Sequence, residues 1–177
     1  MNTRLIAVAI VVAICAACQQ PVTNVKTRGA ELLAPFKQNL KAALVAGMEA
    51  GPAEAISACS VEAPKIAESL SVNSVVMGRS SHKLRNPENA SPDWLAPIIR
   101  GYADGSADLV PVATAIDDGR MGYVEPIMMQ SMCLTCHGET LSADVATKIS
   151  ESYPEDQATG FKTGDFRGVF WVEFPER

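Results

Sequence analysis

The sequence predicts an α+β fold for this 177-residue chain, because segments with helical character come first and segments with strand character come later. Apolar residues recur every four positions between residues 32 and 48, which is the spacing of an amphipathic helix. Apolar stretches rich in β-branched residues follow at 109–116, 122–129 and 169–174, and these predict antiparallel strands. A chain of this length suits one domain with its own core.

Two helices are expected in the first half of the chain. Gly51 ends the first, and Pro52 suits the first turn of the second. Pro64 interrupts the second pattern, so we expect that helix to kink or to end there. The apolar stripes of the two helices consist of Leu32, Phe36, Leu40, Leu44 and Met48, and of Ile56, Cys59, Ala63, Ile66 and Leu70.

The middle of the chain is expected to be less regular. Residues 78–97 are polar and rich in proline, which predicts an irregular segment. A short helical piece is expected at 98–105, ahead of the first two strand candidates. Another short helix is expected at 143–153, where Pro154 ends it.

Residues 1–18 are similar to a lipoprotein signal peptide. Arg4 precedes a ten-residue apolar run that is too short to span a bilayer, and small residues come before Cys18. This pattern predicts lipidation of Cys18 and attachment to a bacterial membrane on its periplasmic side, although Cys15 stands where such motifs carry an aliphatic residue. The alternative is ordinary cleavage near Ala17, which would give a soluble periplasmic protein. Either way the chain is expected to be exported, with a tether at 19–27 and the folded domain at 28–177.

The charge composition argues against one class of partner. The chain has 15 lysines and arginines against 20 aspartates and glutamates, a formal net charge of −5. Removing the signal peptide makes it more negative, because Arg4 is lost and no acid is. A nucleic-acid-binding protein would need a basic face, so the composition argues against a nucleic-acid partner.

One motif carries specific chemistry, the pentapeptide Cys133-Leu134-Thr135-Cys136-His137. Two thiols separated by two residues and followed by histidine are typical of c-type haem attachment. Each thiol forms a thioether with a porphyrin vinyl group, and the imidazole then binds the iron. The motif predicts one covalently bound haem c, with His137 as an axial ligand. Its late position, after a predicted strand, differs from that of small helical cytochromes.

The second axial ligand is open on the residues alone. The only other histidine, His82, lies in a polar segment, where exposure is the ordinary outcome. Cys59 is the one cysteine left without a role, and it suits core packing as well as iron ligation. Of the methionines, Met48 is expected in the core and Met128, Met129 and Met132 in the core or at the haem edge, while Met77 and Met121 stay open as ligands.

Four motifs run in order through residues 30–172. They are Ala55-Ile56-Ser57-Ala58-Cys59 with Ala63-Pro64; Gly78-Arg79-Ser80-Ser81 through Arg85-Asn86-Pro87 with Asn89 and Asp93-Trp94; Cys133-Leu134-Thr135-Cys136-His137-Gly138; and Tyr153-Pro154 with Asp156, Ala158, Gly160-Phe161 and Gly164-Asp165-Phe166-Arg167-Gly168. Together they resemble a bacterial c-type haem family with a PAS-like domain, found as exported stand-alone proteins and as sensor modules of signalling proteins. The chain departs from that pattern at Ser91 and Leu95.

The resemblance implies a PAS-like domain whose N-terminal helices pack on the antiparallel sheet. It also implies that Cys59 supplies a thiolate to the iron opposite His137, and it makes His82 a weaker candidate. Arg79, Arg85 and Arg167 are candidate partners of the haem propionates, because guanidinium pairs well with carboxylate. Each of them equally suits the role of holding a loop through backbone carbonyls.

Three functions fit these residues. The first is redox or gas sensing of carbon monoxide or nitric oxide, in which Cys59 leaves the iron on reduction and a separate signalling partner is needed. The second is electron transfer among exported redox proteins. The third, remote alternative is a zinc or redox-disulfide protein built from the same cysteines. An enzyme is disfavoured, because a ligating Cys59 would close the distal side of the haem.

Overall fold

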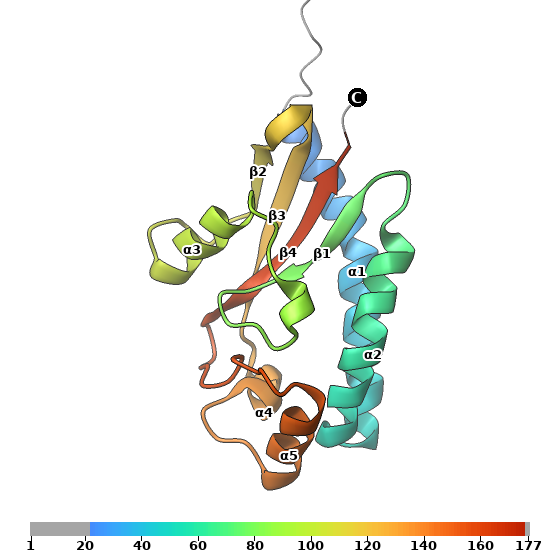
Figure 1. Cartoon of the computed structure of the whole chain (residues 1–177), viewed down its shortest axis with the longest axis vertical. Helices are drawn as coiled ribbons and strands as arrows, with labels where there is room; N and C mark the ends of the chain where they lie inside the picture. The colour runs from blue at the N-terminus through green and yellow to red at the C-terminus, as the bar shows by residue number, and fades with distance from the viewer. Residues whose placement is uncertain (1–21, 176–177) are drawn as a thin grey trace, which may run out of the picture.

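The computed structural model describes residues 22–175, which begin with two long helices lying side by side (Figure 1). Helix α1 spans Val22–Ala50 and helix α2 spans Pro52–Leu70. Gly51 joins them at φ 132°, a backbone conformation that glycine adopts without strain, and Pro52 opens α2 as predicted.

One prediction about these helices is wrong, and another is narrowed. Helix α1 includes residues 22–27 of the expected tether, because Val25 is buried in the core at 5% exposure and holds the first turns in place. Of the two outcomes expected at Pro64, a kink or an end, the helix does not end there: α2 continues to Leu70, because Ala63 is buried and Ala67 and Leu70 pack against the core beyond it. The predicted signal peptide, with Cys18, and residues 19–21 of the tether lie outside the described residues.

Four antiparallel strands form one sheet in the order β1-β4-β3-β2. They are β1 (Val76–Ser80), β2 (Val112–Ala115), β3 (Met121–Met128) and β4 (Phe166–Phe174). Strand β1 corrects the prediction that 78–97 is irregular throughout. Its polar residues conceal it in the sequence, and its pairing with β4, for example Gly78 opposite Trp171, makes it a strand.

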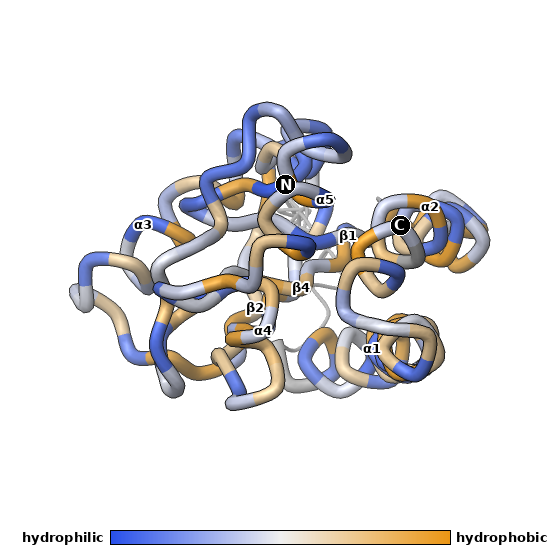
Figure 2. The backbone as a smooth tube through the Cα atoms, turned by 90° about the horizontal axis from the view of Figure 1, so that it is seen from below, coloured by the Kyte–Doolittle hydropathy of each residue, from blue (hydrophilic) through white to orange (hydrophobic). Residues whose placement is uncertain are grey.

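Side chains alternate between the two faces of the sheet. Tyr123, Val172 and Phe174 point to one face and form a core with α1 and the end of α2. Val124 and Val169 point to the other face, where Leu95 and Ile99 cover them. Figure 2 shows α1 and α2 on one side of the strands and α3 (Ala96–Asp104) on the other.

The remaining elements gather at one end of the sheet (Figure 1). Helices α4 (Leu134–His137) and α5 (Ala143–Ser152) lie there, and Val145 and Ile149 of α5 pack against Ile56 of α2. Short 3₁₀ turns occupy Pro87–Asn89, Asp117–Gly119 and Ser131–Cys133. The predicted α+β class, with N-terminal helices on an antiparallel sheet, is therefore confirmed. Within residues 22–175, no helix combines the length and apolarity needed to cross a membrane.

Helix α1 approaches the sheet closely at Gly29. A Cβ atom there would lie 2.3 Å from the Tyr123 ring. We expect Gly29→Ala to lower the free energy of unfolding by about 1–3 kcal/mol, the usual cost of overpacking. Helix propensity alone predicts the opposite, a gain of about 1 kcal/mol. Urea denaturation measures the change, with the reverse exchange Ala42→Gly at an exposed position of α1 as the control. A stabilised Gly29→Ala variant would contradict the close approach.

Candidate functional site

A cavity of about 260 Å³ lies where the helices, the sheet and α4 meet. Helix α1 contributes its last three stripe residues, so Met48 lies in the cavity wall and not in the filled core. Residues 127–129 at the end of β3 and Phe170 of β4 form the other apolar surfaces. The apolar lining consists mainly of Leu40, Leu44, Met48, Ile56, Ile127, Met128, Met129, Met132 and Phe170.

The three reactive side chains of the pentapeptide line this cavity. Cys133 ends a 3₁₀ turn, and Cys136 and His137 lie in the single turn of α4. Gly138 follows because its position is crowded: a Cβ atom there would lie 2.6 Å from the carbonyl oxygen of Leu134. The backbone therefore presents both thiols and the imidazole to one space.

The His137 ring is held in one tautomer. Its Nδ1 lies 2.6 Å from the carbonyl oxygen of Ala158, which can only accept, so Nδ1 carries the proton. The other ring nitrogen, Nε2, then keeps an unshared electron pair, as a metal ligand must. Burial, followed by the charges of Arg85 and Arg167, lowers the pKa of His137 to about 3, so the ring is neutral at physiological pH.

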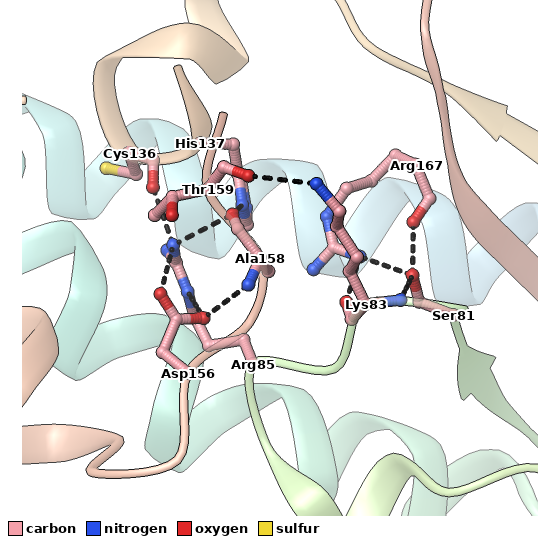
Figure 3. A network of polar contacts seen from close by, with 9 residues as sticks. All are labelled: Ser81, Lys83, Arg85, Cys136, His137, Asp156, Ala158, Thr159 and Arg167. Carbon is pink, nitrogen blue, oxygen red and sulfur yellow. Dashed lines mark hydrogen bonds and ion pairs between the residues drawn. The ribbon is translucent and has the colours of Figure 1, made fainter. Parts of the chain in front are cut away.

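Arg85 connects this histidine to the rest of the site (Figure 3). Its guanidinium forms an ion pair with Asp156, with Nε donating to Oδ1 at 3.0 Å and Nη2 to Oδ2 at 3.3 Å. The same Nη2 donates to the carbonyl oxygens of Cys136 at 2.6 Å and Ala158 at 3.2 Å. Asp156 Oδ1 also accepts the backbone N–H of Ala158. Arg85 thus holds the turn of α4 and the loop that receives His137.

Arg167 holds a second loop. Its Nη1 donates to the Ser81 hydroxyl at 2.9 Å and to the carbonyl oxygen of Lys83 at 3.1 Å, also drawn in Figure 3. The Ser81 hydroxyl in turn donates to the Arg167 carbonyl oxygen. Both Arg85 and Arg167 therefore take the loop-holding role that the sequence left open, while still lining the cavity.

Arg79 differs from the other two arginines. It lines the cavity, and within residues 22–175 its side chain forms no hydrogen bond or ion pair. Burial lowers its pKa, and the nearby Cys59 and Tyr153 partly oppose that effect. The neighbouring Ser80 hydroxyl is buried and also has no partner among the described residues. The cavity wall therefore presents a cation and a hydroxyl whose hydrogen bonds are unfilled.

Cys59 reaches the same cavity from α2 and is half-buried. Burial raises the pKa of its thiol, and the charges of Arg79 and Arg85 lower it by less. Cys59 also borders a second cavity of about 50 Å³, together with Ala63, Pro64, Arg79 and Tyr153. The side chain thus stands between a large and a small cavity.

The other candidates for an iron ligand differ in whether they line the cavity. His82 is exposed and stacks on Phe166, with ring centroids 5.4 Å apart and planes at 16°, outside the cavity lining. Met77 is buried in the core and Met121 packs against that core, so neither reaches the cavity. Met128, Met129 and Met132 line it, as expected for packing around a bound group, and so does Met48, which was expected in the core.

The zinc alternative gains no support from this geometry. Over residues 22–175, no three histidine, cysteine, aspartate or glutamate side chains lie close enough together to hold a metal ion. Cys59, Cys133 and Cys136 are all free thiols, as attachment of a group through two of them requires.

Sequence reasoning missed three parts of the site. It gave no role to Asp156, to the Ala158 carbonyl or to Tyr153, which lines both cavities. All three belong to the fourth motif, so the signal was present, but the contacts join distant parts of the chain: Asp156 meets Arg85, 71 positions away, and Ala158 meets His137, 21 positions away. The small cavity had no signal in the sequence.

The fold and the site together define an α+β domain with a mainly apolar cavity, whose lining includes two closely spaced thiols and a neutral imidazole. The family model described as Tll0287-like matches residues 8–175, and the chain belongs to that family. This membership confirms the family resemblance deduced from the motifs. The crystal structure of the cyanobacterial heme-protein Tll0287 has a similar fold, with a TM-score of 0.67 and 23% sequence identity over 88% of this chain and 96% of that one. No curated protein gave a match.

The environment of Cys59 predicts its reactivity in haem-free protein. Because burial raises the pKa of the thiol, its thiolate fraction at pH 8 is lower than that of an exposed cysteine, and alkylation should rise only at higher pH. Iodoacetamide labelling at several pH values, read by peptide mass spectrometry, measures this. Arg79→Gln removes a favourable charge and should move the profile to still higher pH. Faster labelling of Cys59 than of free glutathione at pH 7 would contradict the prediction.

Proposed function

We propose that this chain is a c-type haem protein carrying one haem, attached through thioethers at Cys133 and Cys136, with His137 as an axial ligand. The observation that carries the proposal is the fixed tautomer of His137, whose Nδ1 proton is held by Ala158 and whose Nε2 electron pair is left for iron. The apolar lining of the cavity suits a porphyrin, and the heme-protein Tll0287 shares the fold.

We propose Cys59 as the second axial ligand. It lines the same cavity as His137 but comes from a different element, α2, so the two can approach a flat group from different walls. His82, Met77 and Met121 lie outside that lining. The lining methionines are the alternatives that the test below separates from Cys59.

Arg79 is the best-supported partner for a haem propionate. Its guanidinium and the Ser80 hydroxyl need hydrogen-bond acceptors, and a carboxylate supplies two oxygens. The guanidinium groups of Arg85 and Arg167 already donate hydrogen bonds to loop residues, which makes them weaker candidates.

The activity that these residues support best is redox or gas sensing. A bound haem would supply a one-electron ferric–ferrous couple and, without one axial ligand, a position for carbon monoxide or nitric oxide. The small cavity beside Cys59 provides space for the thiol to move away, and Pro64 in that wall removes one backbone hydrogen bond from α2. Cys59 would then act as a reversible ligand, and a separate signalling protein would read the change.

Electron transfer is the second candidate. Met128 and Met132 line the cavity and are 37% and 41% exposed, so a bound haem would have an apolar edge accessible to a redox partner. In this function Cys59 stays on the iron in both oxidation states. Catalysis is disfavoured, because ligation by both Cys59 and His137 leaves no open position for a substrate.

We further propose export and membrane attachment. Residues 1–18 would direct export and be removed, and Cys18 would carry the lipid that attaches the domain to a bacterial membrane on its periplasmic side. Cleavage near Ala17, which gives a soluble periplasmic protein, is the alternative.

The haem proposal predicts that protein expressed with haem-maturation machinery carries covalent haem, and that Cys133→Ala with Cys136→Ala abolishes it. Cys59→Ala should change the ferric absorption spectrum, because an anionic sulfur donor is lost. Mass spectrometry and absorption spectra measure both, with Met48→Leu as the control for cavity packing. An unchanged Cys59→Ala spectrum would exclude thiolate ligation by Cys59. A wild-type protein that carries no haem would favour the zinc or redox-disulfide alternative.

Carbon monoxide binding to the ferrous protein favours sensing. A ferrous protein that does not bind carbon monoxide favours electron transfer.

The anchor proposal predicts that wild type fractionates with membranes and is released by detergent. Cys18→Ser should remove the lipid and prevent normal processing of the signal peptide. Metabolic labelling with a fatty acid, followed by fractionation, checks both, with Cys15→Ser as the matched variant that keeps the lipid. A wild-type protein that is soluble and unlabelled would support cleavage near Ala17.

A further inference from the structure

We infer that Arg85 and Asp156 are positioning residues for His137 and that they act on it through the Ala158 carbonyl. Arg85 favours ferrous iron, and Asp156 favours ferric iron. This inference rests on the proposed haem function. It assigns a role to a buried ion pair that the predicted ligands do not explain.

The pair lies beside His137 and its loop, and the charge of Arg85 also acts on the Cys59 thiol. The Arg85 and Asp156 side chains are 12% and 8% exposed. Within residues 22–175, the hydrogen-bond partners of Arg85 all belong to the histidine turn or to its receiving loop, at Cys136, Asp156 and Ala158. Figure 3 shows these groups converging beside His137.

The Ala158 carbonyl is the point of connection. A carbonyl oxygen has two electron pairs, and this one accepts from His137 Nδ1 at 2.6 Å and from Arg85 Nη2 at 3.2 Å. Ala158 is fully buried, so no water competes for the oxygen at its surface. A second, cationic donor makes the oxygen a weaker acceptor for His137, and the ring then has less imidazolate character.

Imidazolate character decides which oxidation state the histidine favours. A stronger acceptor at Nδ1 makes the ring a better electron donor, and this favours ferric iron. Arg85 reduces that acceptor strength, and its positive charge also disfavours the more positive ferric state. Arg85 therefore favours the ferrous state over the ferric state.

Asp156 opposes Arg85. Its carboxylate neutralises the guanidinium through two hydrogen bonds, and its Oδ1 also orients Ala158 through the backbone N–H. Removing either partner leaves the other as a poorly compensated buried charge. Loss of Arg85 leaves an anion beside the histidine, whereas loss of the Asp156 charge leaves a cation.

A purely structural pair would behave differently. Both substitutions would then loosen the same loop and would change the haem environment in the same direction, if at all. Opposite shifts of the reduction potential therefore distinguish the proposed role from a purely structural one.

The test is a reductive titration of haem-loaded full-length protein, followed by absorption, for Arg85→Gln and Asp156→Asn. At the wild-type midpoint, Arg85→Gln should raise the ferric-to-ferrous ratio about tenfold, which is about 59 mV for one electron. Asp156→Asn should lower that ratio by a similar factor. Arg85→Lys, which keeps the charge, should restore most of the wild-type value. Arg28→Gln removes a cation that packs on Phe174 and should leave the ratio unchanged.

Asp156→Asn is nearly isosteric and keeps an oxygen for the Ala158 N–H, so it tests the inference even if Arg85→Gln fails to fold. Shifts of both variants in one direction, or no shift of Asp156→Asn, overturn the inference and leave the proposed function intact. A wild-type protein that attaches no haem overturns the proposed function, and the inference with it.

Discussion

The hydrogen bond from His137 Nδ1 to the Ala158 carbonyl is the interaction on which the site depends. It fixes which ring nitrogen carries the proton and where the ring lies. That bond requires the loop at 156–158 to be held against α4, which is what the fork of Arg85 does through Asp156, Ala158 and Cys136. One buried ion pair thereby joins three segments that are far apart in the sequence, and the protonation of the imidazole follows from its geometry.

The helices serve two purposes along their length. In the first half of α1, Leu33 and Phe36 fill the core against the sheet, and Gly29 allows the backbone to come close to Tyr123. In the second half, Leu40, Leu44 and Met48 face a cavity that Ile127, Met128 and Phe170 of the sheet also line. Such a large apolar space is costly to leave empty, because its walls lose contacts and hydrophobic burial. The arrangement is consistent with a bound apolar group that completes the packing.

The three arginines illustrate how charge is divided in a buried site. Arg85 and Arg167 satisfy backbone carbonyls that would otherwise be unpaired, whereas Arg79 and the Ser80 hydroxyl have no partner within residues 22–175. A buried polar group without a partner costs about 1–3 kcal/mol. That cost applies to the Ser80 hydroxyl, so this hydroxyl and the adjacent unpaired guanidinium of Arg79 indicate where a ligand carboxylate would be stabilised, and the other two arginines indicate how the walls are held.

The sequence by itself determined the α+β class, the helix boundary at Gly51-Pro52, the family motifs and the thiol–imidazole pentapeptide, because these depend on periodicity, backbone restriction and local spacing. It could not separate Arg79 from Arg85 and Arg167, nor reveal β1, whose polar residues became a strand only by pairing with β4. It left open whether α2 ends at Pro64 or kinks there, and the helix continues because packing against the core outweighs one lost hydrogen bond. Only the tertiary structure placed Cys59 beside the cavity and His82 outside it, since both outcomes depend on contacts between distant segments.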